Sequence, residues 1–396
     1  MYKSNMKILI IGFSTRAIAE SAKQCGYPFL TVDYFGDYDQ KLIAENFSLL
    51  RDGLTEFSPQ GLLAVSKKFN FDAVVYTSNL DNYPALIAEL SGDHLILGNS
   101  PETLAGVRDW HRLKLSLERA GIRTPTSLFS PPEHMADDRK WLRKPIKSGG
   151  GRKIEFWAPG DGLGEEEYLQ EFKTGICCSA ALIANGEDCS VIGLSEQLVG
   201  LAEFGARGFC YVGNIFPLHF TGDENGRNLK NVWEQVRYIA KVITREFSLK
   251  GLNNLDFILD SAYQVHLLEV NPRYSGSMEL MEWAYGVKLF QWHLESFQGH
   301  LPTYPVQFTL THSQQDFFAK AILYAEKNIM IPDTHNWVKK GIKDIPFAGD
   351  VILEGSPICT VFSTGNSREE CFDALFVRGL EVKNELYSGG DTIRGG

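Results

Sequence analysis

The sequence predicts a mixed fold in which an α/β part is followed by α+β parts, and two observations lead to this class. Over residues 1–105, short apolar runs alternate with helix-like stretches. From Lys140 onward, the apolar residues fall mainly into strand-like segments separated by glycines. A chain of 396 residues is too long for one hydrophobic core, so we expect two or three domains.

The first unit, residues 1–105, is predicted to be a Rossmann-like layer. Its expected strands are Ile8–Ile11, Phe29–Val32, Ala73–Tyr76 and Leu95–Leu97. Apolar runs too short for helices, each followed by a helical pattern, indicate a parallel sheet covered on both faces. The turn Gly12–Arg16 lacks the G-x-G-x-x-G pattern, which disfavours a dinucleotide site and a dehydrogenase. Ser14 or Thr15 is expected to cap the helix that follows.

The rest of the chain predicts two further units, residues 106–300 and 301–396. Pro101 to Ala120 predicts a single amphipathic helix that ends at Gly121. Leu255–Leu259 and Val265–Val270 predict a hairpin across Asp260-Ser261. From about Pro302 we expect a small α+β unit, with strands at Asp350–Leu353 and Ile358–Phe362.

Composition and charge exclude several classes of protein. The residues are 44% hydrophobic and 22% charged, as in an ordinary globular protein, and the net charge of −10 argues against a nucleic-acid partner. No apolar run is long enough to span a membrane, and no signal peptide precedes the first predicted strand. The seven cysteines are scattered without C-x-x-C spacing, which favours free thiols and a cytoplasmic location.

The strongest chemical feature is the segment Leu268–Arg273 together with Asp256. Glu269 and Asn271 stand two residues apart on a predicted strand, so their side chains share a face. Asp256, on the neighbouring strand, can face the same cavity. Two carboxylates and an amide oxygen suit Mg²⁺ shared with nucleotide phosphates, and Arg273 adds a fixed positive charge for a phosphate. The alternative, a hairpin with ordinary exposed carboxylates, does not explain why these residues converge.

A second feature is a glycine run that follows a strand lysine. Lys144 precedes Ser148 and the three glycines Gly149, Gly150 and Gly151. Backbone N–H groups of such a loop can close over phosphates, with the lysine as a point charge. The order of residues is not that of a P-loop, and alone the run would indicate only a flexible turn. Its position before the metal-binding pattern favours a phosphate lid.

A third feature is the segment Leu169–Gly175. The backbone of Glu171, Phe172 and Lys173 can offer a carbonyl and an N–H to the edge of an adenine while the Phe172 ring packs beneath it. An ordinary strand end is an equally compatible interpretation.

In this order, the three motifs resemble the ATP-grasp superfamily of carboxylate ligases. The resemblance implies a Rossmann-like pre-ATP-grasp domain (1–105), a two-lobed ATP-grasp domain (106–300, with its lid lobe at about 125–170) and a small C-terminal α+β unit (301–396). The tail segment Asp350–Cys359 is similar to the end of biotin-carboxylase-related members. Residues 12–16 and 33–37 are similar to a "carboligase" group found beside one-carbon carrier genes in methanogens and methylotrophs.

The resemblance also implies roles for individual residues, with ATP and Mg²⁺ (or Mn²⁺) as cofactors. Lys144 would contact the α- and β-phosphates, and Arg273 the transferred phosphoryl group. The residues of the flexible loop would be Ser148, Gly149, Gly150 and Gly151. The adenine would be bound by Glu171, Phe172 and Lys173, and the metal ions by Asp256, Glu269 and Asn271.

Three positions depart from the family pattern. Trp110 stands where the first ATP lysine is usual, so Arg108, or else Arg112, is predicted to supply the charge. Cys177 falls near the place of the acid that commonly binds the ribose hydroxyls. Asn254 replaces an arginine found in some relatives and is predicted to donate to the transferring phosphoryl group.

The expected reaction follows from these parts. A carboxylate takes the γ-phosphate of ATP to form an acyl phosphate, and an amine then displaces phosphate to give an amide, with ADP and phosphate as products. Glu279 is predicted to accept the amine proton, although a carboxylate at a helix start would be equally favourable there. A carboxylase-like or kinase-like enzyme and a nucleotide-binding regulator without turnover stay open. The expected partners are small carboxylates and amines, with a one-carbon carrier precursor and a homodimer as further possibilities.

Overall fold

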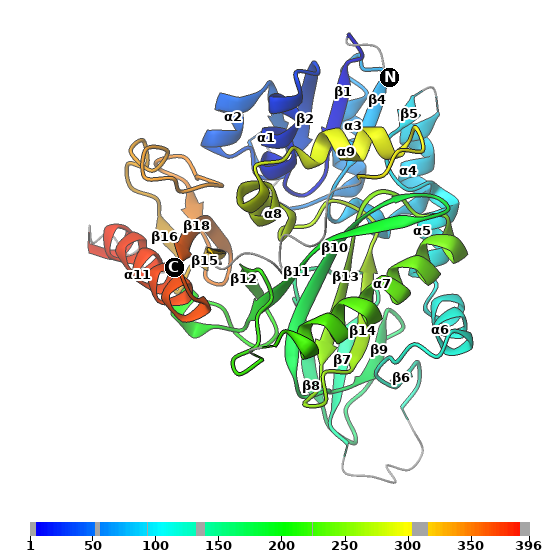
Figure 1. The fold of residues 1–396 in the computed structure, drawn as a ribbon. Coiled ribbons are helices and arrows are strands. Elements are labelled where there is room, and N and C mark those ends of the chain that lie inside the picture. The colour runs from blue at the N-terminus through cyan, green and yellow to red at the C-terminus, as the bar shows by residue number, and fades with distance from the viewer. Residues whose placement is uncertain are drawn as a thin grey trace.

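The computed structural model describes residues 5–51, 56–92, 94–131, 139–223, 225–302 and 316–388. An N-terminal layer lies above a large central sheet, and the C-terminal segment lies beside that sheet (Figure 1). Helix α9 (Leu289–Ser296) contacts both helix α1 (Arg16–Cys25) of the N-terminal layer and strand β13 (Lys250–Leu259) of the large sheet. The N-terminal layer and the sheet are therefore packed together through this helix.

The N-terminal layer is a five-stranded sheet in the order β3-β2-β1-β4-β5, and all of its pairings are parallel. Its strands are β1 (Ile8–Ile11), β2 (Phe29–Asp33), β3 (Asn46–Ser48), β4 (Ala73–Tyr76) and β5 (Leu95–Ile96). Its other helices are α2 (Tyr38–Ile43), α3 (Pro59–Ser66), the 3₁₀ turn η1 (Leu80–Asn82) and α4 (Pro84–Ser91). This confirms the predicted parallel layer. The strand order reverses between β1 and β4, the kind of position at which open parallel sheets commonly bind ligands.

The turn after β1 differs from prediction in one respect. A Cβ at Gly12 would lie 2.0 Å from Thr77 Oγ1, so a glycine is required by the close approach of β4. The predicted side-chain cap of α1 is absent: Thr15 occupies the cap position without a cap hydrogen bond, and its hydroxyl instead donates to Asp33 Oδ2 at 2.7 Å. The Thr15 hydroxyl is directed to the Asp33 carboxylate because a hydrogen bond to a charged acceptor is stronger than one between neutral groups.

The predicted helix from Pro101 to Ala120 is two helices, α5 (Pro101–Arg108) and α6 (Trp110–Arg119). The break is at Asp109, which has extended backbone angles and whose carboxylate accepts the N–H of Arg112 at 3.1 Å. Asp favours such a capping position over a helix interior, because its side chain competes for backbone N–H groups. Arg108 and Trp110 therefore belong to different helices.

A small antiparallel sheet with the order β6-β9-β7-β8 falls mainly within the predicted lid lobe. Its strands are β6 (Ser127–Leu128), β7 (Trp141–Pro145), β8 (Glu155–Trp157) and β9 (Glu167–Glu171). Residues 132–138 of the predicted lid lobe lie outside the described residues. Trp141, Trp157 and Leu169 make the small core of this sheet.

The large sheet has seven antiparallel strands in the order β14-β13-β10-β11-β12-β15-β18. Besides β13, they are β10 (Ile176–Asn185), β11 (Cys189–Val199), β12 (Tyr211–Phe216), β14 (Val265–Asn271), β15 (Phe317–Tyr324) and β18 (Pro357–Gly365). The predicted hairpin is β13–β14. Helix α7 (Arg227–Phe247) buries its apolar side chains on β10, β11 and β14.

The C-terminal segment is continuous with this sheet. Strands β15 and β18 extend it beyond β12, and helix α11 (Arg368–Ser388) packs on both of them. The sheet therefore crosses the predicted domain boundary at residues 300 and 301. The predicted strand at Asp350–Leu353 is the shorter β17 (Val351–Ile352), which pairs with β16 (Ile329–Met330).

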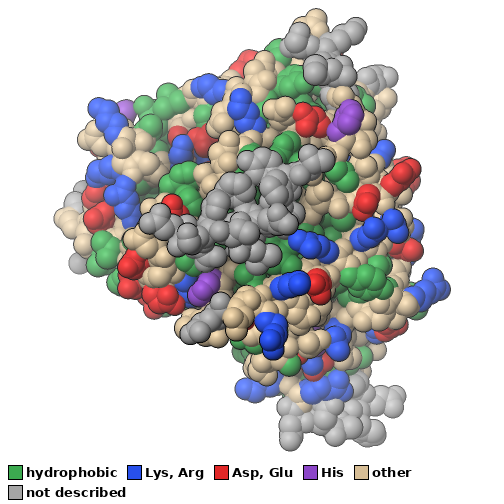
Figure 2. Space-filling model, in the orientation of Figure 1, with side chains coloured by type: hydrophobic (Ala, Val, Ile, Leu, Met, Phe, Trp, Pro, Cys, Tyr) green, Lys and Arg blue, Asp and Glu red, His purple; other side chains and the backbone are tan. Residues whose placement is uncertain are grey.

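On the face drawn in Figure 2, the described basic and acidic side chains are interspersed rather than segregated. Within the described ranges, no helix combines the length and the apolar character that crossing a membrane would need.

Candidate active site

The β13–β14 hairpin brings the three predicted metal ligands together. Asp256 pairs with Glu269 in the register, and Asn254 pairs with Asn271. The Asn271 Nδ2 group donates to Asp256 Oδ2 at 2.8 Å and to Glu269 Oε1 at 3.3 Å. Carboxylate oxygens from two strands thus converge on the Asn271 Nδ2 group. A cation could occupy this position in place of the amide donor.

The charges of this group fit a divalent cation. Burial, together with the negative charge of Glu269, raises the pKa of Asp256 to about 8. Burial also opposes ionisation of Glu269, but the charges of Arg108 and Lys144 outweigh it and lower the pKa of Glu269. Among the described residues, the hairpin included, no group of three or more His, Cys, Asp or Glu side chains is placed to hold a metal ion. The Asn271 oxygen, the third predicted ligand, instead accepts from Arg273 Nη2 at 3.1 Å. Two carboxylates are a partial oxygen set of the kind that Mg²⁺ completes with water and phosphate.

Asn254 is placed differently from its predicted role. It is buried, and its Nδ2 group donates to Asp256 Oδ1 at 2.8 Å, while its Oδ1 accepts from the Ser179 hydroxyl at 2.9 Å. Gln197, which the sequence analysis missed, donates to the same Asp256 oxygen at 2.7 Å. This geometry favours Asn254 as a residue that orients Asp256 over a donor to a phosphoryl group.

Lys144 lies on β7, and its ammonium contacts the neighbouring strand β9. It donates to Gln170 Oε1 at 3.1 Å and lies 5.9 Å from the centre of the Tyr168 ring. Its positive charge also helps to lower the pKa of Glu269 on the hairpin. The contact of Lys144 with nucleotide phosphates stays a prediction.

The glycine run forms a turn docked on the large sheet. Gly150 and Gly151 have φ of 66° and 70°, a left-handed conformation that favours glycine. The Gly150 carbonyl accepts the N–H of Tyr211 at 2.9 Å, and a Cβ at Gly151 would lie 1.8 Å from the carbonyl oxygen of Phe209. The Ser148 carbonyl faces the amide of Asn82 in η1 at 3.5 Å.

The proposed adenine segment uses part of its backbone within the protein. The N–H of Glu171 donates to Thr126 and that of Phe172 to Lys140, both at 2.8 Å. Of the groups predicted to bind adenine, the Glu171 carbonyl and the Lys173 N–H would therefore be available to a nucleotide. The Phe172 ring packs edge-on against Phe156, with the ring centres 5.2 Å apart.

Arg108 and Arg273 meet on a carboxylate that the sequence analysis missed. Arg273 Nε donates to Asp81 Oδ1 at 3.2 Å, and Arg108 Nη2 donates to Asp81 Oδ2. Asp81 lies in η1, directly beyond the carboxyl end of β4, where ligand-binding residues of parallel sheets are expected. The polar residues Asn79, Asp81 and Asn82 after a buried strand are the signal that could have revealed it.

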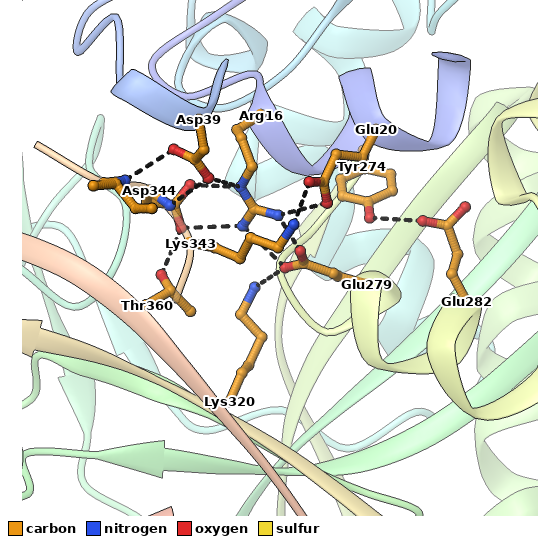
Figure 3. A network of polar contacts seen from close by, with 11 residues as sticks. Arg16, Glu20, Asp39, Tyr274, Glu279, Glu282, Lys320, Lys343, Asp344 and Thr360 are labelled. Atoms are coloured by element: carbon orange, nitrogen blue, oxygen red, sulfur yellow. Dashed lines mark hydrogen bonds and ion pairs between the residues drawn. The ribbon is translucent and has the colours of Figure 1, made fainter. Parts of the chain in front are cut away.

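Glu279 is not placed as a proton acceptor. At the start of α8 (Met278–Tyr285), it accepts hydrogen bonds from the Arg16 guanidinium and, at 2.6 Å, from the Lys320 ammonium. Figure 3 shows its carboxylate facing both cations. Burial opposes its ionisation, but these charges prevail and lower its pKa to about 2. A carboxylate with so low a pKa is a poor base near neutral pH, so the predicted role is not supported.

Lys320 and Tyr211 complete the surroundings of the turn after Arg273. A Cβ at Gly276 would lie 3.1 Å from the Tyr211 hydroxyl and 3.8 Å from Lys320 Nζ. Lys320 is buried on β15, directly opposite Asn214 of β12, and the Tyr211 hydroxyl donates to Asn214 Oδ1. A single lysine within the otherwise apolar run Phe317–Tyr324 is the sequence signal for this position.

Comparison with known proteins finds a domain family that matches part of the chain and solved structures with a similar fold. A family model for the ATP-grasp domain matches residues 107–277. An uncharacterized protein of Methanocaldococcus jannaschii is 24% identical over 396 residues, with 93% of this chain and 92% of that protein covered.

Two solved structures resemble nearly the whole chain. The biotin carboxylase of Campylobacter jejuni, in a β,γ-ATP complex, has a TM-score of 0.68 at 14% identity, covering 94% of this chain and 90% of that one. The L-amino acid ligase of Bacillus licheniformis has a TM-score of 0.67 at 16% identity, covering 96% and 98%. At such low identities, the likeness concerns the fold.

Proposed function

We propose that the protein joins a carboxylate to an amine at the expense of ATP, because residues 107–277 match the family model of the ATP-grasp domain and almost the whole chain resembles a biotin carboxylase and an L-amino acid ligase in fold. The observation that supports this best is that three elements of the fold each contribute charged or polar side chains suited to a metal ion and phosphates. Asp256, Glu269 and Asn271 come from the hairpin, Lys144 from the lid, and Arg273 from the turn after β14.

In this proposal, residues of the lid, the hairpin and helix α5 contact the phosphates and the metal of MgATP. Lys144 and the turn at Gly149–Gly151 would contact the phosphates, and Arg108 would take the place of the missing first lysine. Asp256, Glu269 and Asn271 would hold Mg²⁺ or Mn²⁺, which when bound neutralises phosphate charge. Buried Nε of Arg108 has no hydrogen-bond partner among the described residues, which supports a ligand contact by this side chain.

In the proposed reaction, an oxygen of the acid attacks the γ-phosphorus, and the bond from that phosphorus to the bridging oxygen of ADP breaks. The amine nitrogen then attacks the carbonyl carbon of the acyl phosphate, loses a proton, and phosphate leaves. The protein contributes position and charge, since this chemistry requires little else of its side chains. Arg273, held by Asn271, Ser275 and Asp81, has the fixed orientation that such a role needs.

Trapping the intermediate tests this proposal. The protein is incubated with MgATP, hydroxylamine and one member at a time of a panel of small carboxylic acids and bicarbonate, and ADP and hydroxamate are measured. We expect one class of acid to yield both in equal amounts. ADP release with bicarbonate alone, without hydroxamate, would indicate a carboxylase. Nucleotide binding without ADP release across the panel would contradict a ligase.

Replacing Lys144 by alanine is expected to weaken binding of MgATP by about 1–3 kcal/mol, the range for a hydrogen bond to a charged group. The reason is the loss of an ammonium beside the hairpin carboxylates and the phosphates that they share with the metal. Titration calorimetry with a non-hydrolysable ATP analogue measures the change. Lys147→Ala is the matched control, because Lys147 is half exposed and pairs with the exposed Glu166 at 3.4 Å. Equal affinities of the two variants would remove Lys144 from the nucleotide site.

A further inference from the structure

Asp81 is a buried carboxylate that joins two arginines of the ATP-grasp domain to the N-terminal layer. It is 1% exposed, and each of its oxygens accepts from a different guanidinium group. The arginines come from separate places in the chain: Arg108 ends α5, and Arg273 follows β14. One carboxylate of the N-terminal layer thus sets the orientation of both.

The pairing leaves one donor of the two arginines unused. Burial opposes the ionisation of Asp81, but the charges of Arg273 and Arg108 outweigh it and lower its pKa. Asp81 therefore forms ion pairs with both arginines, and the charge of Glu269 also acts on Arg108. Arg273 is restrained further by Asn271 and Ser275, whereas Nε of Arg108 is buried without a partner within the described part of the chain. Two guanidinium groups with an unused donor are suited to an anionic ligand.

The same short turn reaches the glycine loop. In η1, the residue after Asp81 is Asn82, which is also buried and whose amide lies 3.5 Å from the Ser148 carbonyl. The turn therefore lies between the arginine pair and the loop proposed to cover the phosphates. An N-terminal segment that touches both is at the phosphate end of the nucleotide site.

We propose that Asp81 is a positioning residue that directs Arg108 and Arg273 toward the γ-phosphate of ATP. This inference rests on the proposed function, in which both arginines contact the nucleotide phosphates. If it holds, Asp81 determines how strongly the protein prefers ATP to ADP, because only ATP carries the phosphate that the arginine pair would bind. A purely structural Asp81 would instead hold the N-terminal layer in place and affect both nucleotides equally.

The test compares two variants that each disturb a buried arginine–carboxylate contact. Asp81→Asn removes the charge that orients the arginine pair. Asp344→Asn is the matched control, because Asp344 accepts from Arg16 at 2.9 and 3.1 Å away from the phosphate end. Dissociation constants are measured by calorimetry for Mg²⁺ with the imido analogue of ATP and for Mg²⁺ with ADP. We expect Asp81→Asn to lower the preference for the ATP analogue by about tenfold, as for a charge-assisted hydrogen bond, and Asp344→Asn to leave it unchanged.

A charge-balanced pair of variants keeps the test valid if Asp81→Asn does not fold. Asp81→Asn/Arg108→Met removes one charge of each sign and is compared with Arg108→Met alone. If Asp81 positions Arg273, the double variant loses further preference for the ATP analogue. Two results would each overturn the proposal. One is an equal preference for the ATP analogue over ADP in these two variants. The other is an equal loss of affinity for both nucleotides in Asp81→Asn. Failure of hydroxamate trapping would count against the ligase reaction without changing these binding ratios.

Discussion

Glu269→Gln is expected to reduce ATP turnover by more than about a hundredfold, since metal stabilisation of transition-state charge is worth several kcal/mol. The variant loses one of the two carboxylates proposed to hold the metal. It should still fold, because the charge of Glu269 opposes the ionisation of its buried neighbour Asp256. With glutamine at position 269, Asp256 ionises more readily, so the site keeps one carboxylate charge in the folded protein.

Two measurements check this result. ADP release is followed with the acid identified by hydroxamate trapping, and Mn²⁺ bound in the presence of ADP is counted by electron paramagnetic resonance. Asp260→Asn is the control, because Asp260 lies in the turn at the opposite end of the same hairpin. Turnover or Mn²⁺ binding at the wild-type level in Glu269→Gln would contradict the metal assignment.

Arg16→Met is expected to lower the free energy of unfolding by about 3–5 kcal/mol, the cost of breaking a buried ion pair from one side. Arg16 is 1% exposed and contacts carboxylates from three other parts of the chain (Figure 3). Its Nε lies 2.9 Å from Asp344 Oδ1 and 3.8 Å from Asp39 Oδ2, and its Nη1 donates to Glu279. Without the guanidinium, these carboxylates would stay buried with fewer partners.

Unfolding in urea, followed by circular dichroism, measures this change. Lys67→Met, which removes an exposed partner of Glu89, should leave the midpoint nearly unchanged, because surface ion pairs contribute little. The double variant Arg16→Met/Asp344→Asn should lose less free energy of unfolding than its two single variants lose in sum, since it removes both partners of one pair. A midpoint for Arg16→Met equal to that of Lys67→Met would show that the network does not stabilise the fold.

The local pattern of the sequence was sufficient for the parallel layer and for the β13–β14 hairpin. A strand such as Ile8–Ile11 is apolar at every position because helices cover both faces of its sheet, and that requirement is written directly into the residues. Glu269 and Asn271 share a face because strand side chains alternate, so their convergence also needed no distant contact. The resemblance to ATP-grasp ligases was carried by the hairpin together with two other short segments, the glycine run after Lys144 and Leu169–Gly175.

Contacts between distant segments were decided only by the tertiary structure. Asp81 and Arg273 join the N-terminal layer to the hairpin, and Arg16 and Glu279 join it to α8. Lys320 reaches Glu279 because β15 adds to the large sheet beside β12. The sequence shows only that these side chains are charged. For Glu279, that was enough to predict a catalytic role but not to predict its pairing with Arg16 and Lys320. Whether a buried charge meets an opposite charge depends on which surfaces pack together, and that pairing sets its pKa and its chemistry.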